Sequence, residues 1–436
     1  MKVAFFMNGF PVLSQTFILN QITGLLDRGV DVHIYAGTVN RDAVQHGEVA
    51  EYGLMDRVRC FGDFEPAAPR GRVERVMKAP LVFMRNREAL GPLFRSADCR
   101  VLGWKAASMK FVHEAARFVG RGLDRYDIVH CHFGPNGILC ALLKNVGLIR
   151  GRLLTTFYGY DVTRYPRLHG PGVYRLLFQE ADAILVLSHL MKRQLMDLGC
   201  PDDKITVHRL GVDLSRFSHS SRGKREDGSV RLFTPCRLVE KKGLEYGIRA
   251  VARLARTYPA LRYRIAGDGP LRSELEALIQ ELQAGEAIEI LGWRAQDEVI
   301  GLLSDADILL APSVTAADGD EEGTPTVLIE ALAQGIPVVS TYHSGIPEVV
   351  EDMRSGFLVP ERDVDALANR IEALLRQPGL RGEMGLAGRR FAESHFDIDR
   401  LNDRLVMIYR QLSRELDPVF ESLSVVADAS SGKHDM

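Results

Sequence analysis

Short apolar runs alternate along most of this chain with segments in which apolar residues recur at helical spacing. Residues 2–8 form a run that ends in Asn-Gly, residues 14–29 carry a helical pattern that stops at a glycine, and residues 30–37 form the next run. Such runs are typical of strands buried on both faces of a sheet. The strand–helix–strand opening therefore predicts a parallel α/β sheet.

The alternation occurs twice, on either side of a polar segment. Residues 66–120 are predicted to be helical, and strand-like runs then return up to residue 211. Residues 215–229 are charged and rich in Ser and Gly, which is typical of a linker. The predicted units are a first α/β domain (1–210), a linker (211–229), a second α/β domain (230–390), a helical region that can cross back to the first domain (391–417) and a disordered tail (418–436).

Composition narrows the class of protein. The formal net charge is −2, which argues against a nucleic-acid binder, although residues 70–125 carry 13 Lys/Arg against 5 Asp/Glu. The six cysteines lack metal or disulfide spacing, no signal-peptide pattern opens the chain, and no window approaches the ~20 apolar residues of a membrane span. We therefore expect a cytoplasmic protein that meets a membrane only at its surface, on the inner face.

The segment 320–341 holds two glutamates, Glu322 and Glu330, around a predicted helix start. Thr324 is expected to cap a helix that begins with Pro325, because proline lacks only an N–H that the helix would leave unpaired. The free N–H groups near Thr326 and Val327, together with the helix dipole, then make an anion site. The alternative is an acidic loop followed by a solvated helix stripe.

Two further loops follow predicted strands, and ligands of open α/β sheets bind at the carboxyl ends of strands. Arg237 and Lys242 are suited to a diphosphate, the alternative being a solvated charged turn. The first strand-to-helix turn has a single glycine, Gly9, and no GxGxxG pattern, which argues against an ordinary dinucleotide site. Ser14 or Thr16 is expected to cap the next helix.

The segment 157–165 can bring Tyr158 and Asp161 to a cleft, although Asp161 can equally cap a local turn. Two patterns suggest metal sites. His130 and His132 flank a cysteine on a predicted strand, and residues 318–320 read Asp-Gly-Asp. Both signals are weak, the first because a third ligand is missing nearby and the second because a three-residue match in an acidic loop is common.

Taken together, these motifs resemble the family 4 retaining glycosyltransferases of GT-B architecture, over nearly the whole chain. The segment 321–350 looks like the family's E-x7-E segment with its trailing Gly345, Pro347 and Glu348, and 236–243 looks like its diphosphate segment. Segments 10–22, 155–165 and 199–217 are similar to the branch that builds bacterial exopolysaccharides of the colanic-acid type on a lipid carrier. The resemblance implies two Rossmann-like parallel-sheet domains facing across a cleft.

The resemblance also implies roles for individual residues. It makes Glu322, Tyr158 and Asp161 catalytic, and it puts Gly9, Ser14 and Thr16 with the basic 70–125 region on the acceptor side. Many members have histidine where this chain has Tyr158, and tyrosine keeps a hydrogen-bonding group but does not titrate near neutral pH. The implied donor-binding residues are Arg237, Lys242, Gly267, Gly323, Thr324, Pro325, Thr326, Val327 and Glu330.

The implied reaction is transfer of a hexose, with retention, from a UDP- or GDP-linked sugar to a lipid-linked saccharide. Fixed positive groups would stabilise the leaving diphosphate, so no metal or other cofactor is expected. The basic 70–125 region, with Leu81, Val82, Phe83, Phe94, Trp104 and Phe111 interleaved, can also contact anionic lipid, or it is a solvated helical face. Two alternatives remain open: a sugar-nucleotide epimerase or hydrolase, which needs no acceptor, and a non-catalytic binding partner.

Overall fold

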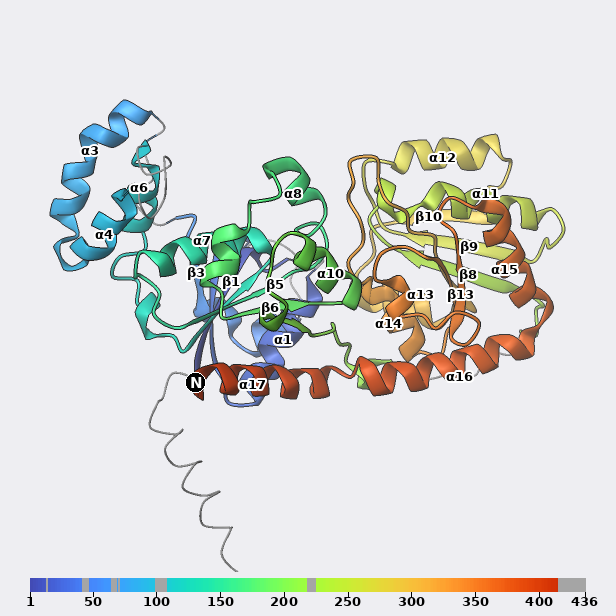
Figure 1. Cartoon of the computed structure of the whole chain (residues 1–436). Coiled ribbons are helices and arrows are strands. Elements are labelled where there is room, and N and C mark those ends of the chain that lie inside the picture. The colour runs from blue at the N-terminus through green and yellow to red at the C-terminus, as the bar shows by residue number, and fades with distance from the viewer. Residues whose placement is uncertain are drawn as a thin grey trace, which may run out of the picture.

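The chain folds into two α/β domains that lie side by side (Figure 1). The tail predicted for residues 418–436 and most of the Ser/Gly-rich segment before residue 225 lie outside the described part. The computed structural model describes residues 1–12, 15–40, 47–63, 69, 71–98, 108–217 and 225–414.

The first domain is built on a seven-stranded parallel sheet with strand order β3-β2-β1-β4-β5-β6-β7. The order changes direction between β1 and β4, so the loops after these two strands diverge at that point. The strands are β1 (Lys2–Phe10), β2 (Asp31–Val39), β3 (Val58–Cys60), β4 (Ile128–His132), β5 (Arg152–Thr156), β6 (Ala183–Val186) and β7 (Ile205–Val207).

The second domain repeats the plan with six parallel strands in the order β10-β9-β8-β11-β12-β13, and its direction changes between β8 and β11. Two Rossmann-like parallel sheets are thus present, as the sequence predicts. The strands are β8 (Val230–Pro235), β9 (Leu261–Ala266), β10 (Ile288–Gly292), β11 (Ile308–Ala311), β12 (Val338–Thr341) and β13 (Gly356–Val359).

Helices surround both sheets. Those of the first domain are α1 (Thr16–Asp27), α2 (Gly47–Glu51), α3 (Arg72–Arg85), α4 (Leu90–Ala97), α6 (Lys110–Ala116), α7 (Gly134–Asn145), α8 (Arg164–His169), α9 (Arg175–Glu180) and α10 (His189–Asp197). Those that follow are α11 (Leu244–Ala255), α12 (Arg272–Glu281), α13 (Gln296–Ser304), α14 (Thr326–Ala333), α15 (Val364–Arg376), α16 (Pro378–His395) and α17 (Ile398–Arg414).

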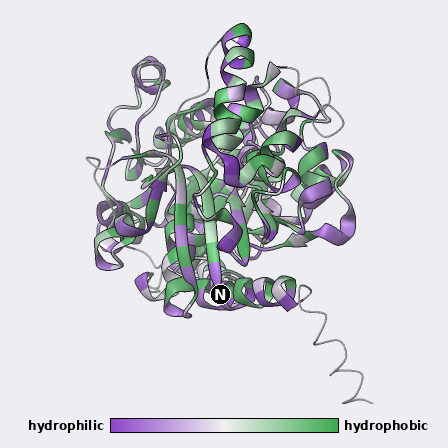
Figure 2. Cartoon of the chain, turned by 90° about the vertical axis from the view of Figure 1, so that its left-hand side faces the viewer, coloured by the Kyte–Doolittle hydropathy of each residue, from purple (hydrophilic) through white to green (hydrophobic). Residues whose placement is uncertain are grey.

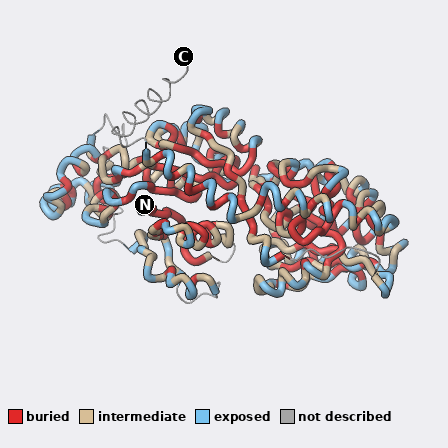
Figure 3. The backbone as a smooth tube through the Cα atoms, turned by 90° about the horizontal axis from the view of Figure 1, so that it is seen from below, coloured by how far each residue is buried: buried red, intermediate tan, exposed pale blue. Residues whose placement is uncertain are grey.

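The elements follow from their patterns of burial. Every residue of β4 is buried, as are all four of β11, because parallel strands are covered on both faces. In α11 the buried residues share one side of the helix, so it packs one stripe on the sheet and turns the other to solvent. Figure 3 shows buried positions concentrated in the two sheets and exposed ones on the outer turns.

The chain crosses between the domains at two adjacent points. Val212 donates its N–H to the Phe396 carbonyl at 2.9 Å, and the Ile398 N–H returns to the Val212 carbonyl at 3.1 Å. Beyond this point α17 lies against α1 of the first domain (Figure 1). Asp403 of α17 pairs with Arg28 of the first domain at 2.6 Å, and the Tyr409 hydroxyl of α17 is hydrogen-bonded to Nδ1 of His130 at 2.6 Å. The two crossings and α17 therefore tie the domains together.

Candidate active site

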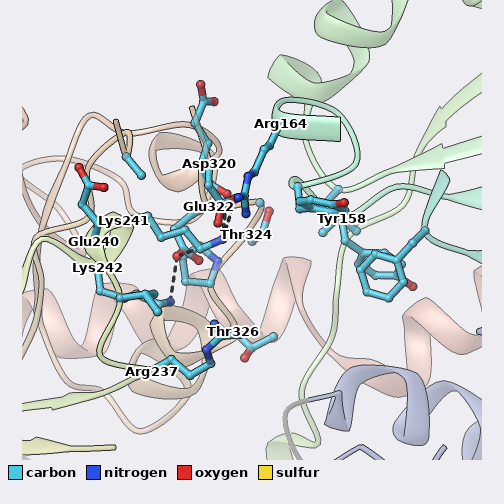
Figure 4. A pocket seen from close by; sticks show the side chains of 18 of the residues that line it. Tyr158, Arg164, Arg237, Glu240, Lys241, Lys242, Asp320, Glu322, Thr324 and Thr326 are labelled. Atoms are coloured by element: carbon cyan, nitrogen blue, oxygen red, sulfur yellow. Dashed lines mark hydrogen bonds and ion pairs between the residues drawn. The ribbon is translucent and has the colours of Figure 1, made fainter. Parts of the chain in front are cut away.

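A cavity of about 530 Å³ lies between the domains, where the loops after the direction-changing strands of both sheets meet (Figure 4). The loops after β1, β4 and β5 supply one wall, and the loops after β8 and β11 supply the other. This is the position at which open parallel sheets bind ligands. The two walls differ in chemistry, since the second domain contributes charged groups and the first contributes aromatic ones.

Glu322 is the central charged group of the second-domain wall. Its carboxylate lies 3.0 Å from the Lys242 ammonium and 3.9 Å from that of Lys241, which also pairs with Asp320 at 3.2 Å. Burial alone would raise the pKa of Glu322, but the two lysines outweigh it and the pKa is lowered. Burial would likewise lower the pKa of Lys242, and Glu322 reverses that shift. The pair is therefore charged on both sides at neutral pH.

His343 fixes the backbone of the Glu322 loop. Its Nε2 accepts the Glu322 N–H at 3.0 Å, so Nδ1 carries the ring proton and donates it to Glu361 at 2.6 Å. The Ser344 hydroxyl donates to the Glu322 carbonyl at 2.6 Å. The sequence analysis did not identify these supports, because they lie about twenty positions away on the loop after β12.

The anion site at the start of α14 differs in one detail from the expectation. The helix begins at Thr326, Pro325 is the extended N-cap residue, and no side chain caps the helix. Thr324 therefore does not cap it, and its hydroxyl has no hydrogen-bond partner among the described residues. The first intrahelical bond comes from the Leu328 N–H, so the N–H groups of Thr326 and Val327 remain available to an anion.

Arg237 stands beside this helix start, close to Thr326 (Figure 4). It is exposed, and no ion pair or hydrogen bond holds its guanidinium within the described part of the chain. Lys242 ends the 3₁₀ turn that follows, and its ammonium forms an ion pair with Glu322. Arg237 is thus a free cation at the mouth of an anion site, on the element that the sequence predicts for a diphosphate.

Glu330 lies outside the main cavity. Together with Thr16 and Arg216 it lines a neighbouring space of only about 30 Å³ between α14 and α1. Burial raises the pKa of the Glu330 carboxyl to about 7, and Arg216 opposes that shift. The two glutamates of the segment therefore face two adjoining spaces, one charged and wide and the other narrow.

The first-domain wall carries aromatic rings. The rings of Phe17 and Phe133 lie 4.9 and 4.7 Å from that of Tyr158. The Tyr158 hydroxyl is buried and bonded to Nδ1 of His132 at 2.7 Å, so the rest of the residue lines the cavity. The tyrosine hydroxyl, which the sequence analysis expected to serve as a hydrogen-bonding group in the site, is therefore bonded within the first domain.

Asp161 and the glycines of the prediction support the walls from behind. The Asp161 carboxylate is fully buried, outside the cavity lining, and accepts the N–H groups of Tyr158, Gly159 and Gly134 at 2.9 Å each. Gly267 follows β9 with φ +146°, and a Cβ there would lie 1.8 Å from the Cys236 carbonyl oxygen.

The acceptor-side residues are only partly brought together. Gly9 belongs to β1 itself, where a Cβ would meet the Thr38 hydroxyl at 2.8 Å. Thr16 is the first residue of α1 and does not cap it, since Gln15 is the N-cap residue. Ser14 lies outside the described residues. Among the described residues, Gln15 before α1 and Phe17 in its first turn line the cavity, and the sequence analysis did not select them.

The two patterns that suggested a metal are occupied by protein partners. His130 bonds Tyr409 and Thr156, at 2.6 and 2.7 Å. Asp318 pairs with Arg164 at 3.0 Å and Asp320 with Lys241. Within the described part of the chain, no group of three His, Cys, Asp or Glu residues is placed to hold a metal ion.

The walls touch directly at one side of the cavity. Arg164 of α8 lies 3.0 Å from Asp318, and Arg167 approaches Glu321 at 3.9 Å. The backbone of Gly323 lies against Tyr158, where an added Cβ would come within 1.8 Å of the Tyr158 carbonyl oxygen. The site is therefore seen with its walls in contact.

The fold and the two-walled site define a GT-B type glycosyltransferase, and comparisons with known proteins agree. The model of Glycosyltransferase Family 4 matches residues 14–216, and that of Glycosyl transferases group 1 matches residues 216–391. WcaL of Escherichia coli, assigned by name to colanic acid biosynthesis, is 40% identical over 377 residues, covering 86% of this chain and 90% of that protein. The amylovoran biosynthesis glycosyltransferase AmsK of Erwinia amylovora is 33% identical over 418 residues, covering 96% and 99%. The chain belongs to the family 4 glycosyltransferases, in the branch of these two proteins.

Solved structures share the fold at low sequence identity. HepE of Anabaena, crystallised with UDP, superposes with a TM-score of 0.69 at 17% identity, over 94% of this chain and 100% of that one. Sucrose-phosphate synthase from Thermosynechococcus elongatus gives 0.68 at 18% identity, over 94% and 99%. These likenesses establish the GT-B architecture.

Proposed function

We propose that this protein is a retaining glycosyltransferase that moves a hexose from a nucleoside diphosphate sugar to a lipid-linked saccharide, in exopolysaccharide synthesis. The observation that carries the proposal is the free Arg237 guanidinium beside the open N-terminus of α14, facing Glu322 and Lys242. Two further facts support it: HepE of Anabaena forms crystalline complexes with UDP and with UDP-glucose, and the names of WcaL and AmsK refer to polysaccharide synthesis.

The charged wall suits a leaving diphosphate. Arg237, the α14 N–H groups and Lys242 would stabilise the negative charge that develops as the bond from the anomeric carbon to the phosphate oxygen breaks. Since these groups supply the positive charge, the proposal requires no metal. Glu322, buried and ionised, would accept hydrogen bonds from the donor sugar hydroxyls.

Retention follows if the acceptor attacks from the face that the phosphate leaves. The acceptor oxygen forms the new bond to the anomeric carbon, and its proton passes to the departing phosphate oxygen. No side chain has to act as nucleophile or base in this scheme. Contact between the two walls would exclude water and so suppress hydrolysis of the donor.

The test is transfer itself. We expect the full chain to move labelled hexose from a UDP- or GDP-sugar to a lipid-linked saccharide fraction, with the anomeric configuration kept by NMR. Glu322→Gln should lower kcat by about 100-fold, because the loss of one preorganised polar contact typically costs this much. Glu351→Gln, a surface carboxylate paired with Arg354, is the matched control and should be unaffected.

The same assay separates the alternatives. Donor turnover at full rate without any acceptor would indicate a hydrolase or an epimerase. Nucleotide binding without transfer to any saccharide would indicate a non-catalytic partner. An unchanged rate in Glu322→Gln would contradict the assignment of the first glutamate.

A contact with anionic membrane belongs to the same proposal. Helices α3, α4 and α6 form a group at the end of the molecule far from the second domain (Figure 1), and Figure 2 views the molecule from that end. Among the apolar residues of the prediction, Leu81 and Phe94 are exposed, Val82 and Phe111 are buried, and Trp104 lies outside the described residues. Phe83 is half-buried and packs against Phe94.

The exposed apolar residues of α3 share one face. Val73, Val76, Met77, Leu81 and Met84 recur at helical spacing, opposite the buried Ala79 and Val82. Residues 71–98 carry six Lys/Arg against three Asp/Glu. An apolar stripe edged by cations is typical of helices that lie in a lipid interface. No helix in the described part of the chain is long and apolar enough to cross a membrane.

Vesicle co-sedimentation tests the contact. The protein should sediment with phosphatidylglycerol-rich vesicles at low salt and less at high salt. The variant Val73→Ser/Met77→Ser/Met84→Ser should bind at least about tenfold more weakly, since it removes apolar area from the interface. Leu386→Ser/Met407→Ser, which alters exposed apolar residues of α16 and α17, is the control. Failure of the unmodified protein to sediment would contradict the contact.

A further inference from the structure

The first-domain wall of the cavity is apolar where the opposite wall is charged. Phe17, Phe133, Tyr158, Leu187 and Leu210 line it. Among the described residues its polar members are few: Gln15 and Tyr160 line it, and Arg164 is already paired with Asp318. A ligand on this wall must therefore present C–H surface, whatever it presents to the charged wall.

Three of the rings form one cluster with Tyr158 at its centre. Phe17 comes from α1, Phe133 from the loop after β4 and Tyr158 from the loop after β5, and both outer rings are tilted against the central one at 4.9 and 4.7 Å. Tyr158 is locked by the bond from its hydroxyl to His132 and by its N–H bond to Asp161. The rings are thus held by three separate elements.

The backbone of Phe133 is strained in the position that places its ring here. Its φ is +71°, a region that residues other than glycine rarely adopt. The bond from its N–H to the Thr156 carbonyl and the bond from Asn136 Nδ2 to the His132 carbonyl hold it there. Strain of this kind persists where the surroundings enforce it, and it is concentrated at functional sites.

We propose that Phe17, Phe133 and Tyr158 form a stacking platform for the apolar face of a pyranose ring, the acceptor sugar of the transfer reaction. The proposal rests on the function proposed above and names the chemistry by which the acceptor is held. A pyranose has a C–H face that packs on aromatic rings, while its edge hydroxyls point outward. Stacked here, the sugar would turn one hydroxyl toward the charged wall and Glu322.

The acceptor fits this wall better than the donor does. The donor carries two phosphates, and the free cation and helix N-terminus that would bind them lie on the second-domain wall. A lipid phosphate as the acceptor group would call for free cations on the first-domain wall. Among the described residues that line this wall the cation is Arg164, which is paired with Asp318. A saccharide matches both the rings and the scarcity of charge.

The platform gives the Tyr158 hydroxyl a structural role and the ring a binding role. Removing the hydroxyl should leave the platform in place, whereas removing a ring should weaken the hold on the acceptor alone. The protein groups that would bind the diphosphate lie on the other wall. Loss of a ring should therefore leave the affinity for nucleotide unchanged.

Saturation-transfer NMR tests the platform without turnover. The probes are the methyl glycosides of glucose, galactose, mannose and glucuronic acid, each added to the full chain with UDP or GDP, while only aromatic protein protons are irradiated. We expect the ring C–H protons of at least one glycoside to receive saturation, and Phe17→Leu to reduce the signal by about half or more. Phe94→Leu, an exposed ring on α4, is the control and should leave it unchanged.

A thermal-shift measurement with UDP and GDP, run on the same samples, separates the two proposals. Nucleotide binding without saturation of any glycoside would overturn the platform and leave the donor site standing. Saturation without nucleotide binding would support the platform and count against the donor site.

Kinetics provide a second test once transfer is measured. Phe17→Leu should raise the acceptor KM by about 3- to 10-fold at unchanged donor KM. Phe94→Leu, the exposed ring on α4, should keep the acceptor KM and the donor KM within about threefold. A rise confined to the donor KM in Phe17→Leu, or an equal rise of the acceptor KM in Phe94→Leu, would overturn the assignment.

Discussion

Buried charge at Glu322 is tolerated because the Lys242 ammonium lies beside its carboxylate and its backbone is hydrogen-bonded on both sides. Its carboxylate pairs with Lys242, its N–H is taken by His343 and its carbonyl by Ser344. A bound diphosphate would compete for Lys242, whereas the backbone contacts would stay. The main chain of Glu322 is therefore fixed, while the Lys242 ammonium beside its carboxylate can also pair with a bound diphosphate. This arrangement suits a residue that contacts substrate.

Glu330 makes a prediction about pH. Its folded-state pKa of about 7 lies above its ordinary value of 4.5, so the folded state binds more protons than the unfolded one between these values. The contribution of this group to stability is therefore complete below pH 4.5 and is lost as the pH rises through 7. The family resemblance implies that Glu330 binds the ribose hydroxyls of the donor. A carboxylate in that role must be ionised, so we expect nucleoside diphosphate affinity to increase between pH 6 and pH 8.

The measurement is calorimetric titration at the two pH values. The ionised fraction of a group with a pKa of about 7 rises about tenfold between pH 6 and pH 8, which bounds the expected change in affinity. Glu330→Gln carries no such charge and should show only the pH dependence of the nucleotide itself. Equal dependence in both proteins would separate Glu330 from ribose binding.

The sequence was informative about residues that follow strands and less so about their supports. Their position after strands made Glu322, Arg237 and Lys242 candidates, because loops at the carboxyl ends of parallel strands converge, and the resemblance to the family then gave them roles. It could not indicate His343, whose contact depends on which strand lies next to β11. Nor could it show that the Tyr158 hydroxyl points into the first domain. That orientation depends on a hydrogen bond to His132, which lies on the neighbouring strand β4.

At the scale of elements, the loop that carries Gly323 sits against the loop that carries Gly159. A Cβ on Gly323 would lie 1.8 Å from the Tyr158 carbonyl oxygen, and Gly159 has φ +133°. Backbone thus meets backbone between the domains, directly beside the cavity. Only glycine allows the two backbones to approach this closely. The size of residue 323 therefore limits how far the two walls can close.

Gly323→Ala should keep the walls apart. A displacement of about 1 Å at the reacting centre is enough to lower transfer by roughly 100-fold. Nucleoside diphosphate affinity should be nearly retained, because Arg237 and the start of α14 lie within one domain. The measurements are kcat and calorimetric nucleotide affinity in the same preparation.

Gly301→Ala is the matched control. It lies on α13 with no atom within 4 Å of its added Cβ, and alanine in a helix is favourable. Transfer should be unchanged in this variant. Full activity in Gly323→Ala would show that the contact is not needed for the reaction.

Apolar runs predicted most strands of both sheets, and β3 and β13 were missed. In β3 an exposed arginine stands between two half-buried residues at the edge of the sheet, so no apolar run marks this strand. The start of α14 was placed one residue early, because proline is favoured at the first helical position but is here extended, with ψ 115°. Propensity indicated the helix, and the local backbone decided its boundary.

At the scale of the whole molecule, two crossings and one long helix hold the domains in register. The crossings pair at Val212, and α17 brings Tyr409 to His130, whose ring lies 4.5 Å from that of His132 behind Tyr158. On the other side, the Glu348 carboxylate accepts the N–H groups of His189 and Leu190 at the start of α10, at 2.9 and 3.0 Å. The domains are therefore joined on both sides of the cavity that lies between them.

The central claim is that the cleft binds a nucleoside diphosphate through Arg237 and the N-terminus of α14. The most direct measurement is calorimetric titration of the full chain with UDP, GDP and ADP, repeated on Arg237→Ala. Because Arg237 is exposed and unpaired within the described structure, its loss should not lower the melting temperature. We predict that UDP or GDP binds and that Arg237→Ala weakens this binding by at least about tenfold. Equal affinity of the two proteins, or no binding of any of the three nucleotides, would contradict the account.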